Sequence, residues 1–104
     1  MTIDSNAVIA RTRDHVETEL DDETIVMHTR SGHIFGMSDT AQAVWRQLAV
    51  PRAFEAIVAG VADDYAIGAD ACREDVRAFL AELAANDMIV VASAADAYSA
   101  GRHP

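Results

Sequence analysis

The side chains that could carry catalytic or metal chemistry are few and scattered. His28 and His33 are five residues apart across an expected turn, and no cysteine or His/Glu motif completes a metal-site spacing around them. Two histidines on a strand surface are the simpler interpretation. Cys72 is the only cysteine, and no nucleophile motif surrounds it. We therefore predict no metal site and no thiol chemistry.

The remaining catalytic patterns are also absent from the sequence. The acidic pairs Asp21–Asp22, Asp63–Asp64 and Glu74–Asp75 fall at expected turns or helix ends, where solvation explains them. The glycines are scattered and form no phosphate-binding loop. We expect a protein that is not an enzyme and needs no cofactor.

Composition limits the classes of partner. The chain has 104 residues, which is typical of one domain, and its net charge is −9 with eight basic residues, all arginine. An acidic surface repels phosphate backbones, so we expect no nucleic-acid partner. No apolar stretch approaches the ~18 residues of a membrane helix, and no signal peptide is visible. A single cysteine fits a cytoplasmic location.

Three segments have the pattern of β-strands. Val16, Thr18 and Leu20 alternate with glutamates, residues 24–29 are rich in β-branched side chains, and His33–Met37 forms a third apolar run. The acidic pair at 21–22 and the turn at 30–32 separate them. These short connections predict an antiparallel meander with the third strand at one edge.

Helical spacing follows at once. Ser38 is suited to cap a helix, and three apolar stripes follow it with the same i, i+3, i+4, i+7 spacing. The stripes contain Ala41, Val44, Trp45 and Leu48, then Phe54, Ile57, Val58 and Val61 with Tyr65 beyond them, then Val76, Phe79, Leu80 and Leu83. Asn86 is suited to end the third helix, and residues 88–91 could form a final strand or a packed extension.

These elements predict an α+β fold, with a three-stranded antiparallel sheet followed by three helices in a helix-turn-helix-like bundle. We expect residues 1–12 to be a flexible N-terminus, residues 13–91 to form the domain, and residues 92–104 to be a disordered tail.

The strand His33–Met37 is the best candidate for a binding edge. An edge strand offers unpaired N–H and C=O groups to an extended peptide. This strand contains no proline, acidic residue, lysine or arginine, and Gly36 lets another backbone approach closely. Loops or the C-terminal tail covering this edge are the alternative. An open edge could also pair with a second copy, so a homodimer stays open.

A DNA-binding regulator is a further hypothesis, drawn from the helix-turn-helix pattern. The third helix offers Arg73 and Arg77, but Glu74, Asp75 and Glu82 lie beside them. Such a helix supplies few phosphate contacts.

Two motifs resemble the PqqD-like family. One is the run from Gly36 to Trp45, GMSDTAQAVW, and the other is the run from Asp75 to Ile89, DVRAFLAELAANDMI. The resemblance spans about residues 13–91. The chain departs from the family pattern at Met37–Ser38, where Leu-Asn is usual, and in the link 49–52, which lacks a glycine.

The resemblance implies a winged helix-turn-helix fold that recognises the leader of a ribosomally made precursor peptide, with stand-alone proteins of lasso-peptide pathways as the most similar type. The leader would add as a strand and be presented to a leader protease or cyclase. A peptide chaperone for a radical-SAM or other modifying enzyme is the alternative. The implied peptide-binding residues are His33, Ile34, Phe35, Gly36 and Met37 on the strand, and Arg73, Glu74, Val76, Arg77 and Leu80 on the third helix. Val76 and Leu80 are wholly core residues in the alternative, and Trp45, Phe79 and Leu83 are assigned to the core.

Overall fold

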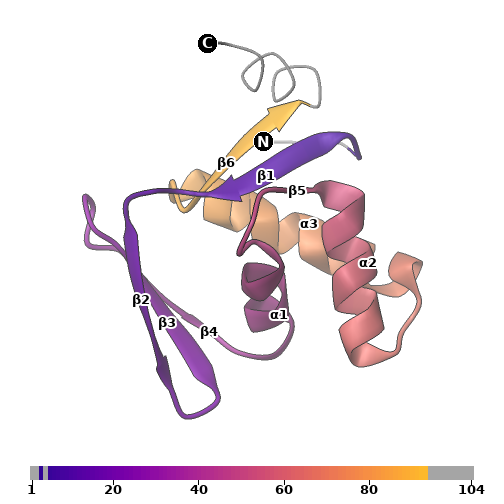
Figure 1. The fold of residues 1–104 in the computed structure, drawn as a ribbon, viewed down its shortest axis with the longest axis horizontal. Coiled ribbons are helices and arrows are strands. Elements are labelled where there is room, and N and C mark those ends of the chain that lie inside the picture. The colour runs from indigo at the N-terminus through magenta and orange to yellow at the C-terminus, as the bar shows by residue number, and fades with distance from the viewer. Residues whose placement is uncertain (1–2, 4, 94–104) are drawn as a thin grey trace.

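The computed structural model describes residue 3 and residues 5–93. Its elements, in chain order, are β1 (Ala7–Arg11), β2 (His15–Leu20), β3 (Glu23–His28), β4 (Ile34–Met37), α1 (Asp39–Gln47), β5 (Arg52–Ala53), α2 (Phe54–Tyr65), α3 (Ala69–Ala85) and β6 (Ile89–Ser93) (Figure 1). The antiparallel strands and the helices α1, α2 and α3 confirm the predicted α+β class.

The predicted meander is present as the sheet β2–β3–β4, in which both pairings are antiparallel. On β3, Thr24, Val26 and His28 are buried, while Ile25 and Met27 are partly exposed. The sheet therefore has an inner face toward the core and an outer face toward solvent. Figure 1 shows α1 between this sheet and α2.

A second sheet, in the order β5–β1–β6, corrects the expectation of a flexible N-terminus. All residues of β1 pair with β6, from Ala7 opposite Ser93 to Arg11 opposite Ile89. Ile9 is completely buried, and only 1% of the surface of Ile3 is exposed. Because the partner strand lies some eighty residues away, nothing local in the sequence shows that these residues are ordered. The predicted disordered tail is also wrong for residues 92 and 93, which belong to β6; its remainder lies outside the described residues.

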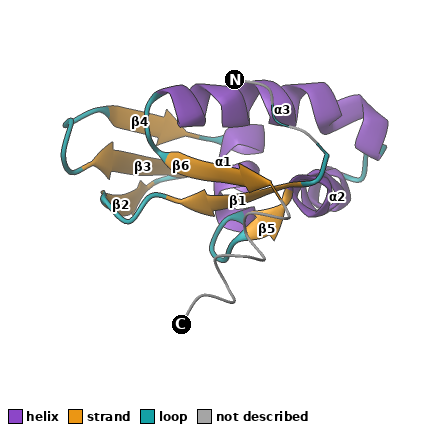
Figure 2. Ribbon diagram, turned by 90° about the horizontal axis from the view of Figure 1, so that it is seen from above, coloured by secondary structure: helices purple, strands orange, loops and turns teal. Residues whose placement is uncertain are grey.

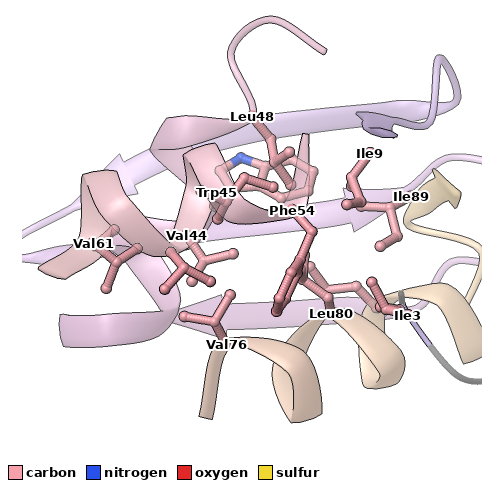
Figure 3. Close-up of a cluster of buried hydrophobic side chains, with 14 of the residues drawn as sticks. Ile3, Ile9, Val44, Trp45, Leu48, Phe54, Val61, Val76, Leu80 and Ile89 are labelled. Atoms are coloured by element: carbon pink, nitrogen blue, oxygen red, sulfur yellow. The ribbon is translucent and has the colours of Figure 1, made fainter. Parts of the chain in front are cut away.

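The three helical stripes meet in one core. Val44, Trp45 and Leu48 come from α1 and the residue after it, Phe54 and Val61 from α2, and Val76 and Leu80 from α3 (Figure 3). Tyr65 does not continue the stripe of α2, because it is 42% exposed. The helix ends differ in detail from expectation: Ser38 is the N-cap of α1 without a side-chain capping bond, and Asp87, not Asn86, takes the left-handed conformation after α3.

Arg11 joins the two sheets through α1. Its Nη2 donates to the Trp45 carbonyl oxygen at 2.6 Å, and its Nη1 pairs with Glu17 at 2.9 Å. The guanidinium also lies 4.2 Å above the Trp45 ring, a cation–π distance. Burial lowers the pKa of Arg11, and the neighbouring Glu17 carboxylate partly offsets this effect. These contacts fix the sheet β2–β3–β4 on the helical core.

Candidate functional site

The strand β4 is an edge strand. It pairs with β3 along one side, and no other strand in the described residues pairs with its other side. Figure 2 shows β4 on the side of its sheet nearest α3, with β2 on the far side. The predicted position of this strand at an edge of the sheet is therefore confirmed among the described residues, and the edge faces the region beside α3.

The register of β4 decides which backbone groups are free. His28 N donates to His33 O at 2.9 Å, so residues 28 and 33 form a hydrogen-bonded pair. Pairs alternate along an antiparallel ladder, and Val26–Phe35 and Thr24–Met37 are therefore also hydrogen-bonded. The N–H and C=O groups of the residues between them, Ile34 and Gly36, point away from β3. These two residues offer two donors and two acceptors to an added strand.

The side chains of β4 divide between the two faces of the sheet. Met37 is completely buried, and Phe35 is partly buried against the core. The ring centroid of His33 lies 4.8 Å from that of Phe35. Ile34, by contrast, is 61% exposed on the outer face. A peptide on this edge can reach backbone from Ile34 and Gly36 and the apolar rim at Phe35, but not Met37.

Gly36 has no side chain to obstruct a strand that approaches this edge. A Cβ built at this position would meet the Glu23 carboxylate, with the nearest oxygen at 2.9 Å. That carboxylate is the far end of a flexible, exposed side chain, so a small side chain at residue 36 displaces it at little cost. The glycine is therefore compatible with alanine in the fold, while its bare backbone remains open to an incoming strand.

His28 holds the turn that starts β4, a role that sequence reasoning missed. Its Nδ1 accepts hydrogen bonds from the backbone N–H groups of Arg30 and Ser31, both at 3.2 Å. The residue is only 6% exposed, which corrects the interpretation of His28 as a strand-surface histidine. The sequence pattern could have indicated this burial, because His28 follows Thr24 and Val26 at a spacing of two and so shares their buried face of β3.

Two of the expected α3 contacts are core residues instead. Val76 and Leu80 are completely buried, and Figure 3 shows both pointing from α3 into the cluster that contains Phe54. This burial supports the alternative that the two residues are wholly core, and it removes them from the lining of a groove. Leu83 is buried, as expected. Phe79 is only partly buried, because it lies at the margin of the apolar stripe that Val76 and Leu83 belong to.

The charged residues expected at the site lie toward α2 and the N-terminal segment. Arg73 donates to both carboxylate oxygens of Glu55, at 2.8 and 3.3 Å, and also pairs with Asp70. Hydrogen bonding to Arg73 is the largest cause of a lowered pKa for Glu55, and the same bonds raise the pKa of Arg73. The structure therefore does not bring Arg73 together with β4.

Arg77 has the same orientation. Its Nε donates to the Ile3 carbonyl oxygen at 3.1 Å, and its guanidinium lies 4.8 Å from the ring centroid of Phe54. Its Nη1 also pairs with Glu74 at 2.7 Å, so Glu74 shares this surface. These contacts fasten the N-terminal segment to α3.

Among the described residues there is no group of three or more His, Cys, Asp or Glu side chains that could hold a metal ion. Within the same part of the chain, no helix has the length and apolar character needed to cross a membrane.

A solved structure resembles this fold. It is described as TbiB1 in complex with the TbiA(beta) leader peptide. The two chains share 25% sequence identity and superpose with a TM-score of 0.70, over 77% of this chain and 93% of that one. No curated protein matches the sequence.

The sequence itself matches a family described as coenzyme PQQ synthesis protein D (PqqD), over residues 23–89. This segment runs from the first residue of β3 to the first residue of β6, and so contains β4 and all three helices. Because the match spans more than half of the sequence, the chain belongs to the PqqD family.

Proposed function

We propose that this chain binds the leader segment of a ribosomally synthesised precursor peptide as an antiparallel strand added to β4. The observation that carries the proposal is the edge itself: Ile34 and Gly36 direct backbone groups away from β3, and no strand in the described part of the chain pairs with them. Strand addition satisfies such groups, and the partner's side chains supply specificity. Membership of the PqqD family and the resemblance to a leader-bound chain support this choice of ligand.

The apolar part of the proposed site comes from the margins of the core. Phe35 on β4 and Phe79 on α3 are both partly buried and pack against it. Alternate residues of an added strand would face this inner side. The proposed site therefore comprises the backbone groups of Ile34 and Gly36 and these two rings. Val76 and Leu80 are left out because they are completely buried, and Arg73, Glu74 and Arg77 because they engage other parts of the fold.

The role of such a chain is delivery rather than catalysis. A bound leader is held near any enzyme that also binds this chain, and the encounter becomes nearly intramolecular. We propose a cytoplasmic, non-catalytic protein on a winged helix-turn-helix scaffold. It would serve a leader protease or cyclase of a lasso-peptide type pathway, and the alternative is a chaperone for a radical-SAM or other modifying enzyme.

DNA binding has less support. The arginines of α3 that would contact phosphates, Arg73 and Arg77, are already paired with carboxylates on α2 or α3. Breaking these pairs offsets part of any gain from phosphate contacts.

Isothermal titration tests the proposal. The ligand is a synthetic leader of the precursor peptide encoded near this chain, and a leader of scrambled sequence is the control. We expect saturable binding of one leader per chain and no binding of the control. Equal binding of both peptides, or of neither, would refute leader recognition.

A further inference from the structure

The outer face of the sheet β2–β3–β4 is apolar, and no described helix or strand covers it. Paired residues of adjacent strands share a face, so Val16 on β2, Met27 on β3 and Ile34 on β4 lie side by side across it. Val16 and Ile34 are 53% and 61% exposed, and Leu20 farther along β2 is 64% exposed. In Figures 1 and 2 no described helix lies on this side of the sheet. A half-exposed sheet ordinarily presents polar residues to water.

This outer face is also hollowed. A depression of about 240 Å³ lies over it, lined by Val16, Glu17, Thr18, Ile25, Met27 and Ile34. Contiguous apolar surface of this kind marks interaction sites in soluble proteins. The depression lies on the face opposite to Phe35, so it is distinct from the rim of the proposed leader site.

The charge beside the outer face favours one type of occupant. The turn that joins β2 to β3 carries Asp21, Asp22 and Glu23, and none of these three forms an ion pair with another described residue. A partner that places lysine or arginine beside this turn gains attraction and faster association. A second copy lacks this complement, since each chain has a net charge of −9.

We propose that the outer face docks a folded protein whose apolar contact residues are flanked by basic side chains. Resting on the proposed function, we assign this partner to the enzyme that processes the leader-bound precursor. The placement suits that role, because a leader added to β4 would extend the same sheet and put alternate side chains next to Ile34. The enzyme would then contact this chain and the leader on one continuous surface.

Val16→Arg tests the apolar contact, and Val50→Arg is its matched control. Both valines are 53% exposed, but Val50 lies between α1 and β5, away from the outer face. The probe is the purified leader protease encoded with the precursor, and binding is measured by surface plasmon resonance. We expect Val16→Arg to raise Kd at least tenfold and Val50→Arg to change it less than twofold. Equal effects of the two variants would overturn the proposal.

Asp22→Lys tests the charge. We expect weaker binding of the protease and a smaller dependence of Kd on salt than in the wild-type chain. An unchanged dependence of Kd on salt would contradict the proposal that basic side chains of the partner lie beside this turn.

Titration with the synthetic leader separates the two proposals. Val16→Arg should bind the leader within twofold of wild type, because residue 16 contributes nothing to the edge of β4. If the leader fails to bind the wild-type chain, the proposed function fails, whereas the protease measurement still reports on the outer face. A wild-type dimer that Val16→Arg converts to monomer in light scattering would assign the outer face to a second copy and overturn the choice of partner.

Discussion

Replacing Gly36 with proline tests strand addition at a single atom. The Gly36 N–H points away from β3, so its loss does not remove a bond of the β3–β4 ladder. A proline nitrogen has no hydrogen to donate, and its ring occupies the space where the added strand would lie. A leader carbonyl left without its donor costs roughly 1–3 kcal/mol. Because 1.4 kcal/mol is a tenfold change in Kd, we expect binding to weaken about 5- to 150-fold.

The assay is isothermal titration of the synthetic leader into wild type, Gly36→Pro and Gly36→Ala. Alanine keeps the N–H and adds only a Cβ, which displaces the flexible Glu23 carboxylate. We expect Gly36→Ala to bind within a fewfold of wild type. Circular dichroism and thermal melting check that both variants are folded. A folded Gly36→Pro variant with wild-type affinity would refute the placement of the leader on β4.

Three further predictions concern the scaffold that positions this edge. Arg11→Ala should lower the free energy of unfolding by roughly 1–3 kcal/mol in urea titration, because it removes the hydrogen bond to the Trp45 carbonyl, the pair with Glu17 and the contact with the Trp45 ring; exposed Arg13→Ala is the control, and equal losses would contradict the role of Arg11. Met37→Asp puts a charge at a completely buried position, so it should cost at least about 3 kcal/mol and unfold much of the protein, and a wild-type melting curve would refute this. The lowered pKa of Glu55, caused first by its hydrogen bond from Arg73, stabilises the fold above the ordinary value of 4.5 and ceases to do so as pH falls through the folded-state pKa. Glu55→Gln should therefore melt below wild type at neutral pH and together with it in strong acid, and a pH-independent difference would contradict this linkage.

Sequence patterns predicted the local part of this fold. Alternation and turn chemistry were sufficient for the meander, and spacing of three and four was sufficient for the three helices, since each depends on neighbours in the chain. The second sheet was not predicted, because β1 pairs with β6, which lies at the other end of the described sequence. Its third strand, Arg52–Ala53, is too short to leave a pattern.

The sequence predicted which strand forms the candidate site, but it did not predict which side chains of α3 lie near that strand. The edge at His33–Met37 follows from the order of strands, and it is present. The α3 residues were less predictable, because a stripe on a helix does not say which margin lies near a given strand. Arg73 and Arg77 contact Glu55 and Ile3, and only the packing of α2 and the N-terminal segment on α3 determines this.

The unusual outer face was visible in the sequence but not interpretable there. Val16 alternates with glutamates in the sequence, and the register places it on the exposed side of the sheet beside Met27. Glu17 lies on the inner side of β2 but is itself exposed, and its carboxylate accepts from Arg11 and lies 3.4 Å from the Trp45 Nε1. The pairing of Glu17 with Arg11 at the margin of the core therefore decides which face of this strand is inward.

Amide hydrogen exchange of β4, followed by NMR with and without the leader, tests the central claim most directly. In the free chain we expect fast exchange at Ile34 and Gly36 and slower exchange at Phe35 and Met37, whose N–H groups point toward β3. Addition of leader should protect Ile34 and Gly36 specifically. Saturation of the chain with leader while these two amides still exchange freely would contradict strand addition at this edge.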